Sequence, residues 1–228
     1  MVGTSGNTFS RVLTGLIPGN LYYFRAYASN SAGGTWAAST EIFAALVTEA
    51  PAPLVINEVH YDPLDPTKFQ EFIELHNPGT SAINLAGWRI ASAVDYAFGN
   101  ISIPAGGYFC VVQDPAKFAT TWPAAAANSA GPWVGKLANS GETIELRDAS
   151  GALVTAVDYG EGFPWPSAPR GAGPSMELLH PSLDPGLGGS WRRAPTVPTP
   201  GAVNAAKLAT SSAAPPAIRQ VNHTPQQP

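Results

Sequence analysis

Short stretches in which hydrophobic and polar residues alternate are the main structural signal in this chain. Alternation with a period of two is typical of β-strands that bury one face. The sequence predicts eight strands, at 54–61, 71–77, 88–91, 100–103, 108–112, 143–147, 153–159 and 175–179. The strands 143–147 and 153–159 form a predicted hairpin, because residues 148–151 end in a glycine that suits a tight turn. Short strands separated by Gly, Pro and Asn turns indicate an all-β antiparallel sandwich or barrel.

Signals for α-helices are almost absent. The one alanine-rich run, 124–127, follows Pro123 and precedes the Gly131-Pro132 pair. Proline and glycine on both sides interrupt a helix, so we interpret this run as a loop.

Composition and pattern divide the chain into four segments. Residues 1–46 contain aromatic residues in alternating positions, and residues 47–53 read as a proline-containing linker. The region 54–204 contains the repeated strands and turns. Residues 205–228 are rich in Ala, Ser, Pro and Gln, which favours a disordered tail or linker, or the start of a further module.

Charge and cysteine content narrow the functional classes. Of the 228 residues, 12% are charged, against about 25% in an average domain, and the net charge is −4. Twelve basic residues spread thinly argue against nucleic acid as a partner. No apolar run approaches the ~18 residues that a membrane span requires. The single cysteine, Cys110, excludes an internal disulfide, and its apolar strand predicts a buried, unreactive thiol.

A series of motifs in the region 54–204 resembles one family. These motifs are INEV at 56–59, EFIELHN at 71–77, LAGW at 85–88, IPAGGY at 103–108, LANSGE at 137–142, VDYG at 157–160, PWP at 164–166, SW at 190–191 and PTPGAVN at 198–204. Together they resemble a lamin tail domain of the bacterial kind. The resemblance implies an immunoglobulin-like β-sandwich that serves as a non-catalytic module of large secreted or cell-surface proteins, where it adjoins fibronectin-like modules and catalytic domains.

The same resemblance assigns packing roles to three tryptophans. Trp88, Trp165 and Trp191 occupy positions that this family also fills with aromatic residues. We therefore expect them to pack in the core or at its rim.

The segment before the linker resembles the second half of a fibronectin type III domain. Alternation over 21–28 predicts a strand with Tyr22 and Phe24 on one face, followed by a turn and a strand through Phe43. Tyr22 falls where that family has its tyrosine-corner residue. The first four strands of such a domain are missing. We therefore expect the chain to be a slice of a mosaic protein, in which residues 215–225 resemble the first strand of a further module.

Acidic residues are concentrated near the first strands of the second region. Five lie within 17 residues: Glu58, Asp62, Asp65, Glu71 and Glu74. Strand alternation places Glu58 on the face of Ile56, and Glu74 on the face of Phe72. A carboxylate on an apolar face must be paired, hydrogen-bonded or bound to a metal.

Two interpretations of these acids remain open. Glu58, Asp62 and Glu71 could bind calcium together with loop carbonyls, as in a calcium-stabilised adhesion module. Their spacing matches no calcium-loop motif. We therefore favour structural hydrogen bonds from Glu58 or Glu74 to a backbone turn, or to an arginine such as Arg89.

Loop aromatics suggest an alternative function. Trp122 and Trp133 flank the 123–132 loop, and exposed aromatics there could stack on sugar rings of a polysaccharide or another cell-envelope component. This alternative requires at least one of the two rings to be exposed beside polar groups.

Nothing in the sequence marks an enzyme. The histidines, which we expect at the surface or in loops, are His60, His76, His180 and His223. None has the spacing of a zinc site, and no nucleophile motif is present. The sequence therefore predicts a non-catalytic structural or interaction module without a cofactor other than the calcium considered above. The resemblance, and not the composition, implies an extracellular or cell-surface location.

Overall fold

The computed structural model describes residues 21–44, 53–166 and 173–214. The chain forms two units, Met1–Ala50 and Pro51–Pro228. Each is described here by itself, and residues 215–225, with His223, lie outside the described ranges.

The first unit contains two small antiparallel ribbons. Strand β1 (Leu21–Phe24) pairs with β4 (Glu41–Ala44), and β2 (Tyr27–Asn30) pairs with β3 (Gly33–Trp36). The predicted strand 21–28 is therefore interrupted at residues 25–26, where the Ala37 amide donates to the Ala26 carbonyl at 2.8 Å.

Aromatic rings line one face of the first ribbon. The rings of Tyr22 and Phe24 lie 5.8 and 6.0 Å from that of Phe43. Tyr22 and Phe24 thus share a face, as the alternation predicts. The role of Tyr22 as a tyrosine corner stays a prediction.

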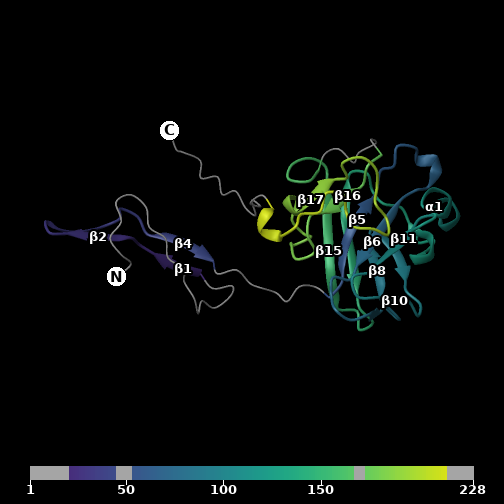
Figure 1. Cartoon of the computed structure of the whole chain (residues 1–228), viewed down its shortest axis with the longest axis horizontal. Helices are drawn as coiled ribbons and strands as arrows, with labels where there is room; N and C mark the ends of the chain where they lie inside the picture. The colour runs from purple at the N-terminus through teal and green to yellow at the C-terminus, as the bar shows by residue number, and fades with distance from the viewer. Residues whose placement is uncertain (1–20, 45–52, 167–172, 215–228) are drawn as a thin grey trace. The chain divides into compact units, whose positions relative to one another are not determined.

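The second unit is an antiparallel β-sandwich of two sheets (Figure 1). The six-stranded sheet consists, in spatial order, of β12 (Ser129–Ala130), β11 (Tyr108–Val112), β6 (Phe72–His76), β5 (Val55–His60), β16 (Met176–Leu178) and β17 (Trp191–Arg193). The five-stranded sheet consists of β13 (Val134–Gly135), β9 (Val94–Ala97), β8 (Arg89–Ser92), β14 (Gly141–Arg147) and β15 (Leu153–Gly160). A separate pair joins β7 (Ile83–Asn84) to β10 (Ser102–Ile103), and short 3₁₀ turns occupy Pro66–Lys68, Ala126–Asn128, Gly188–Ser190 and Ser211–Ala213.

The all-β prediction is confirmed, and each of the eight predicted strands overlaps an observed one. The predicted hairpin is β14–β15, with Gly151 at a φ of 86°. The strands that the pattern missed, such as β12 and β13, are mostly two or three residues long. Alternation cannot be recognised over so few residues.

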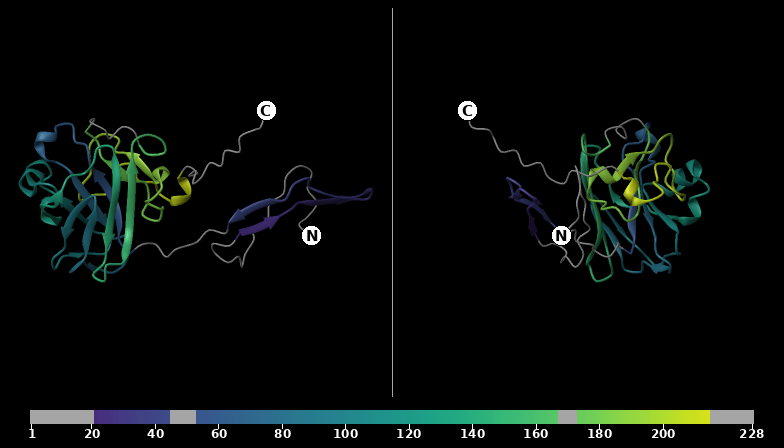
Figure 2. Two further views of the ribbon diagram at one scale, coloured as in Figure 1. Left: turned by 180° about the vertical axis from the view of Figure 1, so that it is seen from behind. Right: turned by 60° about the vertical axis from the view of Figure 1, so that its left-hand side comes forward.

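The main core lies between the two sheets. Its fully buried members include Ile56, Ile73 and Val111 from the six-stranded sheet, and Ile90 and Ile144 from the five-stranded sheet. The outer face of the six-stranded sheet carries a second, smaller cluster around Phe72, Val112 and Phe118. In the right-hand view of Figure 2, the teal helix α1 (Pro115–Thr121) and the green strand β15 lie on opposite sides of the domain.

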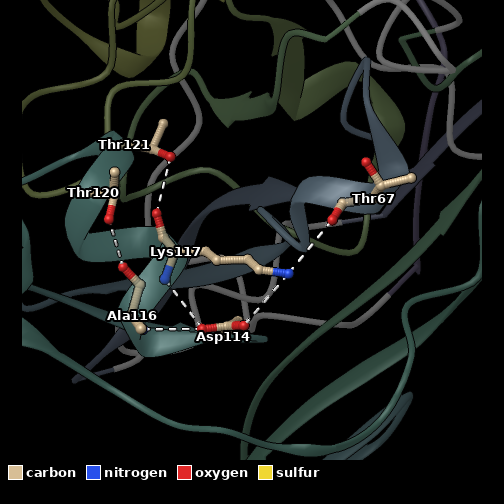
Figure 3. A network of polar contacts seen from close by, with 6 residues as sticks. All are labelled: Thr67, Asp114, Ala116, Lys117, Thr120 and Thr121. Atoms are coloured by element: carbon tan, nitrogen blue, oxygen red, sulfur yellow. Dashed lines mark hydrogen bonds and ion pairs between the residues drawn. The ribbon is translucent and has the colours of Figure 1, made fainter.

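Helix α1 corrects the expectation of almost no helix. Asp114 begins it by accepting hydrogen bonds from the Ala116 and Lys117 amides at 3.0 and 3.1 Å (Figure 3). The Lys117 ammonium lies 3.5 Å from the Thr67 carbonyl and 3.8 Å from Asp114, which ties the helix to the loop after β5. An Asp-Pro pair is a good helix-start signal, so the sequence contained this information. The alanine run 124–127 overlaps a 3₁₀ turn and not a helix.

Two glycines of the β14–β15 hairpin allow a matched test of this fold. Gly141 and Gly151 both have positive φ, 109° and 86°. A Cβ on Gly141 would lie 2.6 Å from the Gly160 Cα and clash with the Tyr159 carbonyl, whereas one on Gly151 meets nothing within 4 Å. We expect Gly151→Ala to lower the free energy of unfolding by about 1 kcal/mol, from backbone strain alone. Gly141→Ala should lower it by about 2 kcal/mol more in urea denaturation, and equal losses would contradict this packing.

Candidate functional site

Three glutamates form a row across the middle of the six-stranded sheet. Glu177 on β16 pairs with Glu58 on β5, and Glu58 pairs with Glu74 on β6. All three are fully buried. Cys110 on β11 is paired with Glu74, and its thiol lies 3.6 Å from a Glu74 oxygen. We call Glu58, Glu74 and Glu177 the carboxylate row.

A β-bulge turns this row away from the main core. Ile56 pairs with Leu75, and Glu58 pairs with Glu74, so Asn57 is an extra residue on β5. One extra residue moves the following side chains to the opposite face. The expectation that Glu58 shares a face with Ile56 is therefore wrong, because alternation cannot reveal a bulge.

The row holds a segment without regular structure. We call residues 195–208 the strap. Backbone amides of the strap donate one hydrogen bond to each glutamate: Thr199 to Glu58 at 2.9 Å, Gly201 to Glu74 at 2.5 Å and Ala206 to Glu177 at 2.6 Å. The carboxylates thus accept hydrogen bonds from backbone amides that have no partner on a neighbouring strand.

Two asparagines fix the strap further along. The amide nitrogen of Asn204 donates to the carbonyls of Asn57 and Leu178, both at 2.9 Å. The Asn204 oxygen accepts from the Asn57 side chain at 2.7 Å. The Leu208 amide donates to the Leu179 carbonyl at 2.8 Å, so hydrogen bonding to the domain continues past the end at 204 that we expected.

Burial makes the carboxylate row a poor place for negative charge. Burial raises the pKa of Glu58 to about 7, against 4.5 in water. Burial, and then the charge of Glu58, raise the pKa of Glu74 to about 8. Neither carboxyl forms an ion pair within the described part of the chain. At neutral pH the row therefore retains protons.

A second group of acids holds the loop before β14. Glu71 accepts from the Leu137 amide at 3.2 Å, and Glu142 accepts from the Ala138 amide at 2.5 Å. Asp62 accepts from the Asn139 side chain at 2.6 Å. Burial raises the pKa of Glu71 to about 7.

These contacts decide between the two interpretations of the acids. Glu58, Asp62 and Glu71 each accept from different protein donors, and the structure brings no three His, Cys, Asp or Glu side chains of its described ranges into a metal-holding group. The structure therefore gives no support to the predicted calcium site at these residues. Glu58 and Glu74 bind backbone amides, as the favoured interpretation held, whereas Arg89 pairs with Asp95 at 2.7 Å.

The loop tryptophans do not form an exposed platform. Trp133 is 6% exposed and belongs to the main core. Trp122 is half-buried, and its ring packs against Phe72 and Phe118. Burial removes Trp133 from the predicted sugar-stacking site, and only the half-buried Trp122 could still contribute to it.

Three further tryptophans of the second unit pack in or against the main core. Trp191 is fully buried and donates from its indole nitrogen to the Pro185 carbonyl at 2.8 Å. Trp88 and Trp165 are half-buried against the main core.

Two histidines differ from the surface positions that we expected. His60 and His76 are buried, and they pair with Phe72 and Val55 instead of with each other. His60 lies between two backbone carbonyls, and burial lowers its pKa. Both rings therefore stay in the domain as uncharged packing groups at neutral pH.

The family model of the lamin tail domain matches residues 48–161, which is half of the chain. The chain belongs to the lamin tail domain family. Neither a curated protein nor a solved structure is significantly similar to it. The match ends at the end of β15, so β16, β17 and the strap lie outside the matched region but complete the same sandwich.

Membership in the lamin tail domain family accounts for the architecture. The family is immunoglobulin-like, and its domains are generally non-catalytic interaction modules. In this member, the buried acids are the side chains best suited to acid–base or metal chemistry. They serve instead as acceptors for backbone amides of the strap and of the loop before β14.

Two neighbouring strap residues test how much the strap contributes to stability. Asn204→Ala would remove the hydrogen bonds that its side chain donates to the buried Asn57 and Leu178 carbonyls. We expect the free energy of unfolding to fall by about 2–3 kcal/mol in urea denaturation. Val203→Ala, at a residue that is 55% exposed, should change it by less than about 0.5 kcal/mol. Similar effects of the two substitutions would contradict the described contacts.

The raised pKa values predict an unusual dependence of stability on pH. Above pH 4.5, Glu58, Glu71 and Glu74 keep their protons in the folded domain, whereas the unfolded chain loses them. Their contribution to the free energy of unfolding is fully present below pH 4.5 and is lost as the pH rises through 7 to 8. The lowered pKa of His60 acts in the opposite direction, below pH 6.5.

A single neutral substitution isolates this dependence. As the pH rises from 5 to 8, the Glu74→Gln variant should become more stable relative to the unchanged protein. The slope is at most about 1.4 kcal/mol per pH unit for one proton. Urea denaturation at four pH values measures it, and parallel curves would contradict a protonated Glu74.

Proposed function

We propose that this chain is a non-catalytic spacing or interaction module of a larger secreted or cell-surface bacterial protein. The observation that carries the proposal is the use of the buried acids. Glu58, Glu74 and Glu177 are fully buried, and they bind the protein's own amides. A general acid or base must reach the substrate, and these carboxyls face the strap instead.

The remaining reactive group supports the same proposal. Cys110 is fully buried, and burial raises the pKa of its thiol well above the usual value. A thiol nucleophile needs a lowered pKa and an open approach. No helix among the described residues is long and apolar enough to cross a membrane.

We further propose that the first unit belongs to a fibronectin type III-like neighbour. Its two ribbons contain exposed aromatic residues, among them Tyr23 at 70% and Trp36 at 57%. A two-stranded ribbon is marginally stable alone, and apolar faces of this kind favour contact with further strands. Adjacent domains of the same protein are therefore the proposed partners.

Two measurements on the full chain test the proposed function. In the first, the chain is incubated with chromogenic esters, phosphodiesters and glycosides, with and without Mg²⁺, Ca²⁺ or Zn²⁺. We expect no turnover above the buffer rate. Turnover that follows the protein through two purification steps would contradict a non-catalytic role.

The second measurement tests location. Antibodies raised against residues 51–228 are applied to intact and to permeabilised source cells. We expect equal labelling of both, because the module lies outside the membrane. Labelling of permeabilised cells alone would contradict the proposed secreted or surface location.

A further inference from the structure

The strap is attached to its sheet mainly by polar contacts. Its valines, Val197 and Val203, are 64% and 55% exposed, and Asn204 is its most deeply buried side chain. The sheet residues under it are the carboxylate row, with Asn57 and Leu178. Because little apolar surface of the strap is buried, its attachment depends on the state of the carboxyls.

Hydroxyl geometry limits the charge that the row can carry beneath the strap. The Thr199 hydroxyl oxygen lies 3.2 Å from a Glu58 oxygen and 3.0 Å from a Glu177 oxygen. A hydroxyl has one proton and can donate to only one of them. The second contact becomes a hydrogen bond only when that carboxyl is protonated and donates to the Thr199 oxygen.

The charged groups around the row do not neutralise it. The titratable and charged groups on the elements packed against it, besides the glutamates, are His60, His76, Tyr108, Cys110, Lys117, Arg192, Arg193 and Lys207. Arg192 is paired with Glu177 in register, but its guanidinium donates to the Gly189 and Trp191 carbonyls. No ion pair within the described ranges joins Lys117, Arg192 or Lys207 to the row.

The other neighbours add no positive charge. Burial lowers the pKa of His60 and of His76, so both rings are uncharged at neutral pH. The Cys110 thiol donates to Glu74 and stays protonated. Ionisation of Glu58 and Glu74 would thus place two negative charges on adjacent strands, with no ion pair to either of them within the described ranges.

We propose that the strap is a pH-sensitive latch, which opens locally, with the sandwich still folded, when Glu58 and Glu74 beneath it lose their protons. The raised pKa values of Glu58 and Glu74, which arise first from burial, support this geometry. In the open state the carboxyls are hydrated and ionise near their ordinary value of 4.5. Opening therefore releases protons, and rising pH favours it.

Opening would uncover the row and the region beside Cys110. The Gly201 amide, which lies next to the Cys110 thiol, leaves with the strap. The cysteine is the single one in the chain, so its labelling reports this event without an engineered probe. Both Glu177 and the strap lie outside the region that the lamin tail model matches.

Amide hydrogen exchange on the full chain tests the latch. The Thr199, Gly201 and Ala206 amides, which donate to the row, are compared with the Ile73 amide in the centre of the six-stranded sheet. Rates are divided by the intrinsic exchange rate at each pH. We expect the opening equilibrium of the three strap amides to rise about 10- to 100-fold from pH 5.5 to 7.5. The Ile73 amide should exchange far more slowly, and the strap amides should show a much smaller urea dependence than Ile73.

Two neutral substitutions distinguish the latch from general loosening. In Glu58→Gln, the amide can accept from the Thr199 backbone and donate to its hydroxyl, so the strap contacts remain while one ionisation is removed. We expect the pH dependence of strap opening to weaken at least several-fold. Glu71→Gln removes an equally buried acid that holds the loop before β14, and it should leave the dependence unchanged.

A third variant and a second readout keep the test decisive if Glu58→Gln fails to fold. Thr199→Val removes the shared hydroxyl and should raise strap opening about tenfold at pH 5.5, where it is otherwise lowest. Labelling of Cys110 with a maleimide, divided by the thiolate fraction, should follow the strap amides. The proposal is overturned if exchange of the strap amides does not depend on pH, or if it shows the same urea dependence as exchange of the Ile73 amide. It is also overturned if Glu71→Gln weakens the pH dependence of strap opening as much as Glu58→Gln does.

Discussion

Buried carboxylates that accept hydrogen bonds from backbone amides are the interaction on which this sandwich depends. A domain with so few charges places three glutamates in register across β16, β5 and β6, and none of them forms an ion pair within the described residues. Each binds one amide of a segment that forms no strand. An unpaired buried amide costs about 1–3 kcal/mol, so the acids make an irregular covering of the sheet energetically acceptable. The loop before β14 is held by the same device, through Glu71 and Glu142.

The fold and the buried site were predictable to different degrees, for physical reasons. Alternation located β5, β6, β11, β14 and β15, because each is long enough to show a period of two. It failed for β12 and β13, which have two residues each, and for the helix, whose signal was a single Asp-Pro pair. It also placed Glu58 on the wrong face, because the extra residue Asn57 has no signature in sequence. The strap amides that bind Glu58 and Glu74 lie more than 120 residues away in the chain, and no local pattern encodes them.

The segments that cover the six-stranded sheet determine which of its side chains reach solvent. The main core is shared by both sheets, but the outer face of the six-stranded sheet is covered by α1 and its following loop at one end, and by the strap at the row. Beside that loop Trp133 is buried and Trp122 is half-buried, which leaves little exposed aromatic surface for a sugar. The strap removes the carboxyls from solvent. What remains is a closed module of the lamin tail family, whose proposed role lies in contacts with neighbouring domains.

The most direct test of this account is the titration of the row itself. Carbon-13 labelling of the glutamates, with NMR detection of the side-chain carboxyls, gives the pKa of each group in the folded full chain. The account predicts midpoints near 7 for Glu58 and near 8 for Glu74. Midpoints near the ordinary value of 4.5 for both groups would contradict it. The row would then be charged at neutral pH, and it could not be the buried, proton-holding support of the strap.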